Sequence, residues 1–349
     1  MSAVRLAVAG AGLIGTEHIK RISASKLTEL AAIVDPSVAA QAVAQHHAVP
    51  WFSDLRSFLD SGLAQGLVLA TPNHLHAEQT RLCIDAGLPT LVEKPLTHSL
   101  ESAQALLNYY HSVSTAPPIL VGHHRAYSAI MESASHTIQS GKLGKLVAVQ
   151  GSALFYKPAH YFKEGIWRTE SGGGPILLNL IHEIGNLRQL AGEIRRVFAL
   201  SSNHQRGFAV EDSCAITLEF ANGALGTFLL SDTAASPKSW EQTAGENKSY
   251  AHYPDQSCYH VAGTRGALSI PSMQMHFYDE ATDPSWWNSF QQSTTKVADI
   301  DPLVAQIESF VRVIKGQEMP RVSIEDGFQN LRVVEAIRES ARLRQIIEL

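Results

Sequence analysis

The sequence predicts an α/β protein with two domains. Its 349 residues exceed the ~250–300 at which a single hydrophobic core tends to divide. Short apolar runs alternate with amphipathic segments up to residue 121, and this rhythm changes after His124. We therefore expect a doubly covered parallel sheet in 1–121 and an α+β domain with a large, mostly antiparallel open sheet in 122–349.

The N-terminal domain is predicted from its apolar runs. Strands are expected at 4–10, 30–34, 66–70, 90–93 and 119–121, and helices at 13–24, 37–46, 53–61, 74–86 and 99–112. Continuous apolar strands that alternate with helices are typical of a parallel sheet buried on both faces.

The C-terminal domain carries different signals. Asn222-Gly223 lies between two strand-like runs, which predicts a hairpin. A buried helix is expected over 175–192, ending at Gly192. Further expected elements are a helix ending near 139, strands at 146–155, 258–262, 265–270 and 274–278, and helices at 302–315 and 325–345. This order favours an antiparallel sheet with helices on one face. The polar segment 234–257 has no role that its composition defines.

Composition excludes several classes of protein. The net charge is -5 and no basic block is present, so nucleic acid is not an expected partner. No stretch approaches the ~18 consecutive apolar residues of a membrane span. The three cysteines are far apart and form no CxxC pair, so neither a disulfide framework nor a zinc site is expected. A reducing, cytoplasmic location and no metal are the predictions.

A glycine-rich turn follows the first expected strand. Gly10, Gly12 and Gly15 form G-x-G-x-x-G and open the first helix. In a βαβ unit these glycines allow a tight turn, close approach of the backbone to a pyrophosphate, and close helix packing. The helix N-terminus, with Leu13 and Ile14, supplies N–H groups for phosphates. The pattern predicts a Rossmann dinucleotide-binding domain.

Asp35 ends the second expected strand, twenty residues after Gly15. A carboxylate at this place accepts hydrogen bonds from both ribose hydroxyls and repels a 2′-phosphate. Pro36 and Ser37 follow it, and no arginine is present to bind that phosphate. NAD is therefore favoured over NADP.

Two polar motifs follow the next strands. Thr71-Pro72-Asn73, with His76 close behind, comes after the third strand, and Glu93-Lys94-Pro95 comes after the fourth. Ligands of open α/β sheets bind at the carboxyl ends of the strands. We therefore expect Lys94 to lie near the nicotinamide.

Several segments together resemble the Gfo/Idh/MocA oxidoreductases, which include glucose-fructose oxidoreductase and inositol dehydrogenase. They are AGAGLIG, ATPNHLHAEQT, VEKPLTHSLESA, VGHHRAY and GGGPILLNLIHEIGNLRQLAG. The resemblance extends to about residue 230. It implies an NAD(P)-dependent dehydrogenase acting on CH–OH groups, with Lys94 as catalytic acid/base and His182 assisting.

The resemblance also implies binding residues. For the cofactor they are Gly10, Gly12, Leu13, Ile14, Gly15, Asp35, Thr71, Pro72, Asn73, His76, Glu93, Lys94, Trp167 and Arg168. For the substrate it implies Lys94, His123 and His182, and the polar side chains of Tyr156 and Asn179 are further candidates because they can bind hydroxyl groups. A cis bond before Pro95 is a further expectation.

The proton chemistry agrees with a lysine at position 94. Oxidation of a secondary alcohol removes a hydride from carbon and a proton from oxygen. Free lysine, with a pKa near ~10.4, is a poor base at neutral pH. Partial burial and the neighbouring nicotinamide charge both disfavour the ammonium, so the pKa of Lys94 is expected to fall.

Asn179 and His182 lie three residues apart on a helix whose neighbours are apolar, so they share one face. Many members of the resembled family carry an aspartate four residues before this histidine, and here that position is Leu178. Asn179 can form hydrogen bonds but cannot act as a carboxylate base, which leaves more of the proton transfer to Lys94 and His182.

The predicted function is NAD-dependent hydride transfer to or from a secondary hydroxyl of a sugar, inositol or related cyclic polyol. A homodimer or homotetramer through the C-terminal sheet is expected from the resemblance. Two alternatives remain open: an NAD-dependent glycosidase that oxidises its sugar transiently, and a cofactor-sensing regulator without catalysis. Lys94 and His182 argue against the regulator.

Overall fold

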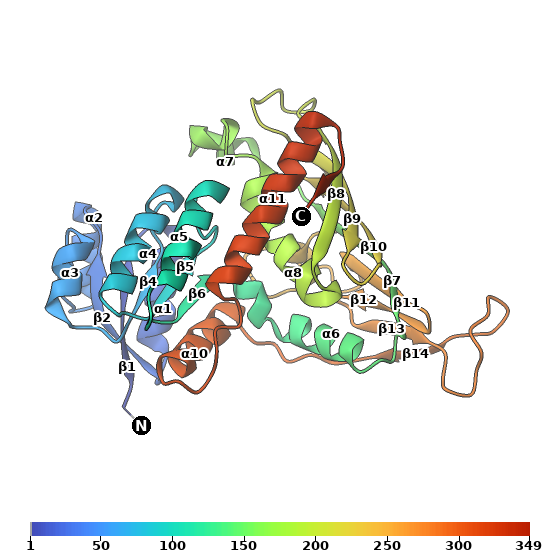
Figure 1. Cartoon of the computed structure of the whole chain (residues 1–349), viewed down its shortest axis with the longest axis horizontal. Helices are drawn as coiled ribbons and strands as arrows, with labels where there is room; N and C mark the ends of the chain where they lie inside the picture. The colour runs from blue at the N-terminus through green and yellow to red at the C-terminus, as the bar shows by residue number, and fades with distance from the viewer. Residues whose placement is uncertain (1) are drawn as a thin grey trace. The chain divides into compact units, whose positions relative to one another are not determined.

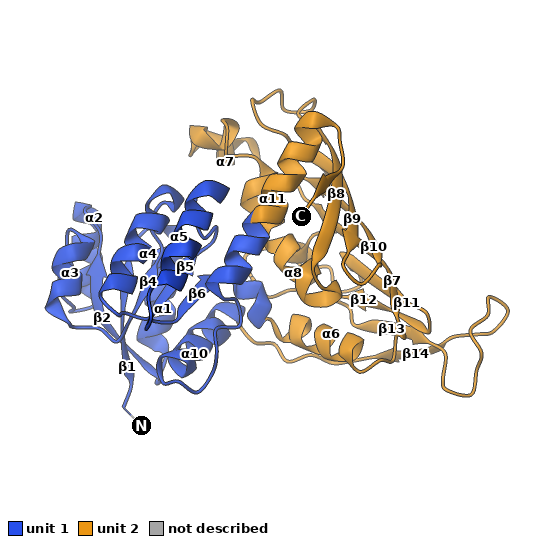
Figure 2. Ribbon diagram, viewed as in Figure 1, with its two compact units in different colours: residues 1–127, 302–331 blue, residues 128–301, 332–349 orange. Residues whose placement is uncertain are grey.

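The computed structural model describes residues 2–349 and divides into two compact units (Figures 1 and 2). The first unit runs to Tyr127 and resumes over Pro302–Leu331, and the second comprises Ser128–Asp301 and Arg332–Leu349. The division falls slightly beyond the expected boundary at 121/122, and residues 302–331 join the first unit. The domains predicted from the sequence, 1–121 and 122–349, stay a prediction, because compact units and domains need not coincide.

The first unit contains a six-stranded sheet of order β3-β2-β1-β4-β5-β6 in which every pair is parallel. Its strands are β1 (Val4–Ala9), β2 (Thr28–Val34), β3 (Trp51–Phe52), β4 (Gly66–Leu69), β5 (Thr90–Glu93) and β6 (Ile119–Gly122). Every residue of β4, β5 and β6 is buried. The predicted parallel sheet is confirmed, and the two-residue strand β3 is an addition to it.

Helices cover both faces of this sheet (Figure 1). They are α1 (Leu13–Ala24), α2 (Val38–His46), α3 (Leu55–Ser61), α4 (His76–Asp85) and α5 (Leu100–Ser112), with the 3-10 turns η1 (Asn73–Leu75) and η2 (His124–Tyr127). Side chains of Ser37, Asp54 and Ser99 accept hydrogen bonds from N–H groups in the first turns of α2, α3 and α5. Such caps satisfy backbone donors that a helix leaves unpaired, which explains where these helices begin.

The C-terminal stretch 302–331 belongs to the core of the first unit. Helix α10 (Pro302–Ile314) places the buried side chains of Ile307 and Phe310 in one cluster with Leu6 and Val68 of the sheet. The Val121 amide also donates to the Val322 carbonyl at 2.9 Å. Burial of this apolar surface gives the returning chain its place in the unit.

A buried carboxylate ties the turn after β5 to helix α1. Glu93 is 6% exposed, and its Oε1 lies 2.7 Å from Nε2 of the fully buried His18. Burial would raise the pKa of Glu93, but the hydrogen bond from His18 and the nearby charges, Lys94 among them, together outweigh it and the pKa is lowered. The carboxylate is therefore ionised inside the protein because His18 compensates it.

The second unit is built on a nine-stranded sheet of order β14-β13-β12-β11-β7-β10-β9-β8-β15. Its strands are β7 (Leu146–Leu154), β8 (Ile194–Ser202), β9 (Ser213–Phe220), β10 (Leu225–Ser231), β11 (Tyr259–Gly263), β12 (Gly266–Ile270), β13 (Gln274–Phe277), β14 (Gln291–Thr294) and β15 (Ile347–Glu348). Only β7 and β10 pair in parallel. The predicted mostly antiparallel sheet is confirmed, and so is the β9–β10 hairpin, where Gly223 has φ +87°.

The helices of this unit are α6 (Ala129–Gln139), α7 (Ala159–Lys163), α8 (Ile181–Ala191), α9 (Trp240–Thr243) and the C-terminal part of α11 (Ile324–Leu343), with the 3-10 turn η3 (Ile166–Thr169). Helices α6 and α8 contact each other and lie along one face of the sheet (Figure 2). Helix α8 ends before Gly192, as predicted. Its expected regular start differs, because Ile176–Leu180 forms a π-helical turn. In the described residues, no helix combines the length and apolarity needed to cross a membrane.

Phe310→Ala should destabilise the first unit by about 3–5 kcal/mol, because it opens a cavity in the core that α10 completes. Hydrogen exchange of the β1 and β4 amides, followed by mass spectrometry, measures unfolding of this unit directly. Glu308→Ala on the same helix is the matched control. Equal exchange rates in the two variants would contradict the placement of 302–331 in this core.

His18→Leu should destabilise the protein by about 1.5–3 kcal/mol at pH 7, because it leaves the Glu93 carboxylate buried without its partner. A carboxyl group with a lowered pKa contributes stability above its unfolded pKa near ~4.3, and that contribution is lost as the pH falls through the lowered value. The deficit relative to the parent should therefore shrink below about pH 4. Urea unfolding at pH 7 and pH 4, with His46→Leu as the exposed control, tests this; a deficit independent of pH would refute it.

Candidate active site

The glycine turn after β1 is enforced by close backbone packing. Gly10 has φ +89°, and a Cβ there would lie 2.5 Å from the Ala70 carbonyl oxygen. A Cβ on Gly15 would lie 1.9 Å from the Gly10 carbonyl oxygen. A Cβ on Gly12, in contrast, would meet nothing within 4 Å. The chain itself therefore requires glycine at 10 and 15, whereas the space beside Gly12 is open for another molecule.

The first turn of α1 borders this open space. Gly12 is the N-cap residue, and no side chain caps the helix there. Leu13, the first helical residue, has an exposed side chain. A helix start with free N–H groups and a partial positive charge fits a phosphate.

Asp35 lies beside the glycine turn, at the end of β2. Its Oδ2 accepts a hydrogen bond from the Ala11 amide at 2.9 Å, and its Oδ1 accepts one from the Ser37 amide at 2.8 Å. Burial would raise the pKa of Asp35, but these hydrogen bonds outweigh it and the pKa is lowered. The residue therefore presents a charged carboxylate at the predicted ribose position.

His76 joins the turns that follow β4 and β5. Its Nδ1 lies 2.8 Å from the Pro95 carbonyl oxygen and its Nε2 lies 2.9 Å from the Thr71 carbonyl oxygen. Burial lowers the pKa of His76, so a neutral ring donates to one of these carbonyls at a time. This geometry holds the Thr71-Pro72-Asn73 segment against the Lys94 turn. A direct contact of His76 with the cofactor stays a prediction.

Lys94 directly follows the buried end of β5. Its amide lies 3.2 Å from Glu93 Oε2, and the Lys94–Pro95 peptide is cis, as the family resemblance implied. A Cβ on Gly122 would lie 2.9 Å from the Glu93 carboxyl group. The neighbouring strand must therefore carry glycine where this carboxylate lies.

His123 and His124 follow β6. His123 is buried, and its Nε2 lies 3.3 Å from the Asn330 amide nitrogen. Burial and the adjacent Arg125 lower the pKa of His124 to about 4, so that ring is neutral at physiological pH. Of the two, only His123 was predicted to contact substrate.

The other predicted site residues lie in the second unit, where a glycine loop precedes the π-helical turn. Glu211 Oε1 accepts the Ile176 amide at 2.9 Å, and a Cβ on Gly174 would lie 2.3 Å from that same oxygen. Burial raises the pKa of Glu211. This half-buried acceptor anchors the start of the helix that carries Asn179 and His182.

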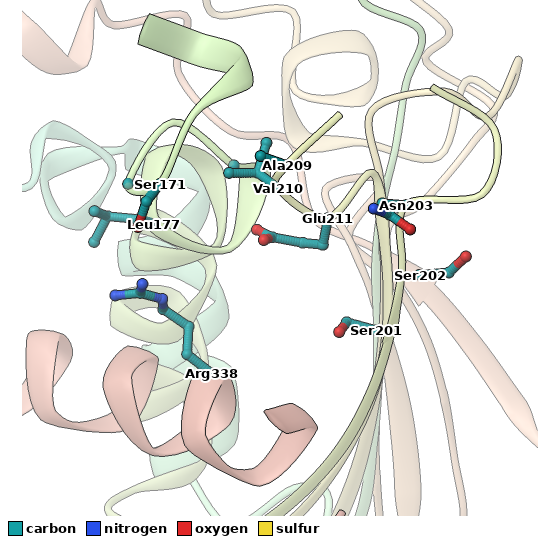
Figure 3. Close-up of a pocket in the computed structure, with 11 residues that line it drawn as sticks. Ser171, Leu177, Ser201, Ser202, Asn203, Ala209, Val210, Glu211 and Arg338 are labelled. Carbon is teal, nitrogen blue, oxygen red and sulfur yellow. The ribbon is translucent and has the colours of Figure 1, made fainter. Parts of the chain in front are cut away.

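Glu211 also lines a pocket of about 300 Å³ (Figure 3). In the close-up its carboxyl group and the Arg338 guanidinium both point into the pocket. The other lining residues are Ser171, Gly172, Gly174, Leu177, Ser201, Ser202, Asn203, Ala209 and Val210. Neither Asn179 nor His182 is among them, so this pocket is distinct from the predicted catalytic face of the helix.

Asn179 belongs to a polar cluster on the π-helical turn. The Lys157 ammonium donates to Asn179 Oδ1 at 2.8 Å and lies 3.5 Å from Asp232 Oδ2. His182, in the first turn of α8, is 8% exposed. π-Helical turns occur often at functional sites, which agrees with the predicted role of this segment.

The aromatic residues before the glycine loop are exposed. Tyr156 and Trp167 each present more than half of their surface to solvent. The Arg168 guanidinium lies 3.9 Å from the Tyr161 ring centre and 5.5 Å from that of Trp167. These side chains are available to a ligand, and their assignment to cofactor or substrate stays a prediction.

Three residues organise these sites in ways that the sequence did not predict: His18, Lys157 and Glu211, of which only Lys157 was considered, as a possible contact of sugar hydroxyls. Each acts on a partner far along the chain, at position 93, 179 or 176. Their sequence neighbourhoods do not identify these partners.

Two family models match the chain. Residues 4–116 match the model described as "Oxidoreductase family, NAD-binding Rossmann fold", and residues 131–269 match the "GFO/IDH/MocA C-terminal domain". Together they cover most of both units.

Curated relatives match almost end to end. The rhizopine catabolism protein MocA of Rhizobium meliloti is 24% identical, over 97% of this chain and 95% of its own. D-xylose 1-dehydrogenase (NADP(+)) 2 of Haloferax volcanii is 25% identical and inositol 2-dehydrogenase of Rhizobium meliloti is 24% identical, each over 98% of both chains.

Among solved structures, the WlbA dehydrogenase of Bordetella pertussis, in complex with NADH and UDP-GlcNAcA, superposes with a TM-score of 0.79. The two chains are 21% identical, and the match covers 100% of this chain and 99% of WlbA. That likeness shows the shared fold. The two family models establish that this chain belongs to the Gfo/Idh/MocA family of oxidoreductases with an NAD-binding Rossmann fold.

Proposed function

We propose that this oxidoreductase transfers a hydride between NAD and a secondary hydroxyl of a sugar, inositol or related cyclic polyol, with Lys94 as the acid/base. One observation carries the proposal. Strands β1, β4 and β5 are neighbours in the parallel sheet, and each is followed at its carboxyl end by a predicted motif. The glycine turn, the Thr71 turn and Lys94 therefore lie along one edge, where α/β sheets bind ligands.

The residues present fit NAD. The open space at Gly12 and the uncapped start of α1 suit the pyrophosphate. The ionised Asp35 suits unmodified ribose hydroxyls and disfavours a 2′-phosphate. Thr71, Pro72, Asn73 and Glu93 would hold the nicotinamide half, with Trp167 and Arg168 contributing from the second unit.

Bound NAD would supply the hydride acceptor. Lys94 would remove the proton from the substrate hydroxyl during oxidation and return it to the carbonyl oxygen during reduction. The Glu93 carboxylate beside its amide stabilises the turn that presents the side chain. A positioned acid/base of this kind contributes ~10²–10⁴-fold to rate.

His182 and Asn179 would contact the substrate from the second unit, with His123 and Tyr156 as further contacts. His182 would hydrogen-bond the reacting oxygen and assist proton transfer. Leu178 offers no carboxylate at the position where many relatives carry one, so Lys94 would be the principal base.

The names of relatives support a carbohydrate or polyol substrate. Two curated relatives are named for D-xylose and inositol, and WlbA was crystallised with a nucleotide sugar. The D-xylose relative is named for NADP(+), so the names of relatives do not decide between the two cofactors. The proposed preference for NAD in this chain therefore rests on Asp35.

A homodimer or homotetramer through the second unit's sheet is part of this proposal. Leu225 and Leu229 on β10 and Leu200 on β8 are exposed apolar side chains, and the strand register aligns Leu229 with Leu200 through Ala215 of β9. Exposed apolar side chains on one face of the sheet suit a surface that another subunit covers.

Lys94→Ala should lower the rate of NADH formation by about 10²–10⁴-fold with any substrate that a sugar and cyclitol panel identifies. Lys20→Ala, an exposed lysine on α1, is the matched control. Equal rates in Lys94→Ala and parent would overturn the assignment of the base. Release of an aglycone without net NADH would instead favour the glycosidase.

Asp35→Asn should weaken NAD binding about tenfold and narrow the preference for NAD over NADP, because it removes the charge that repels a 2′-phosphate. The amide oxygen can still accept the Ala11 hydrogen bond, so the turn should keep its shape. Calorimetric titration of both cofactors, with the exposed Asp60→Asn as control, measures the effect. An unchanged ratio of the two affinities would show that Asp35 does not select the cofactor.

A further inference from the structure

The orientation of the Asn179 amide is fixed by a lysine. Lys157 Nζ lies 2.8 Å from Asn179 Oδ1. An ammonium group can only donate hydrogen bonds, so the atom facing it must be the amide oxygen. The Asn179 NH2 group has no hydrogen-bond partner among residues 2–349, and it is not sealed from solvent.

Lys157 has more N–H groups on its ammonium than it has polar partners. Its ammonium carries three N–H groups, and its two polar partners in the described chain are Asn179 and, at 3.5 Å, Asp232. Its side chain is 12% exposed, so the remaining donor is near the surface of the unit. Lys157 and Asn179 therefore present hydrogen-bond donors only.

The negative charges near Lys157 do not neutralise its positive charge. Asp232 is shared, because its other oxygen accepts the Arg206 side chain at 2.8 Å. The Asp232 carboxylate therefore interacts with two cations, Lys157 and Arg206. The charge of Glu241 acts on Lys157 more weakly than that of Arg206. The Arg168 guanidinium lies over the Tyr161 ring that Lys157 also faces, which adds a further cation. Burial lowers the pKa of Lys157 and Asp232 opposes that effect.

A neutral hydroxyl is a poor match for such a surface. It can accept a hydrogen bond, but it brings a proton that needs an acceptor, and Asn179 and Lys157 offer none. A carboxylate accepts at both oxygens and donates nothing. Hydrogen bonds from charged donors to carboxylates are also about twice as strong as neutral ones.

We propose that Lys157 and Asn179 form a subsite for a carboxylate of the substrate, so that the protein prefers sugar acids to the corresponding neutral sugars and polyols. This inference rests on the proposed dehydrogenase function and narrows its substrate class. Asn179 lies three residues before His182, so the carboxylate would be bound beside the reacting hydroxyl.

The test compares matched pairs of compounds on the protein loaded with NAD: D-gluconate with D-glucitol, and D-galacturonate with D-galactose. Calorimetry measures binding and absorbance measures NADH formation. We expect at least one acid to bind ten times more tightly than its neutral partner. Lys157→Met and Asn179→Asp should each remove that preference, the first by loss of the cation and the second by adding a negative charge in place of the donor.

Lys163→Met, an exposed lysine nearby, is the control for lost charge and should keep the preference. In Asn179→Asp the new carboxylate still accepts a hydrogen bond from Lys157, so this variant is expected to fold even if Lys157→Met does not. Thermal unfolding of every variant measures whether it is folded. Equal affinity for acid and neutral compounds, binding of neither, or a preference that survives both substitutions would overturn the subsite.

Failure of the subsite and failure of the proposed function give different results. NADH formation from neutral compounds that depends on Lys94, without preference for acids, would overturn the subsite and leave the dehydrogenase standing. Absence of NAD binding by the parent protein would overturn the dehydrogenase, whatever the acids do.

Discussion

A charged carboxylate inside the first unit constrains everything around it. Glu93 is ionised and buried, so it must be compensated, and His18 on α1 does this. The same carboxyl group receives the Lys94 amide and lies where a side chain on residue 122 would be. One group therefore links the helix that follows the glycine turn to the turn that carries the candidate base.

The second unit contains a similar arrangement of a glycine and a carboxylate, built from other residues. Glu211 occupies the space that a side chain on Gly174 would need, and it accepts the first amide of the π-helical turn. In both units a glycine thus leaves room for a carboxylate, and the carboxylate holds the backbone next to a candidate functional residue. The glycines do more than allow turns, because they make room for acceptors that a side chain would exclude.

The sequence predicted what depends on local pattern. Helix α1 begins and ends where its apolar period and glycine turn indicated, and the β9–β10 hairpin forms at Asn222-Gly223. It did not predict the return of 302–331 to the first unit, because the apolar face of α10 shows that it packs but not against what. The π-helical turn was also missed: its contacts with Glu211 and Lys157 come from distant parts of the chain, where the local pattern does not reveal them.

The contacts that we propose to set cofactor preference and substrate preference are separate. Asp35 is held by Ala11 and Ser37, all in the first unit, whereas Asn179 is held by Lys157, and Lys157 by Asp232, all in the second. Within the described residues no side chain belongs to both sets. A substitution that alters one preference therefore leaves the contacts of the other in place. Relatives in this family are named for D-xylose with NADP(+) and for inositol. Separate contacts for cofactor and substrate allow each preference to vary without the other, since function resides in sites placed on a shared fold.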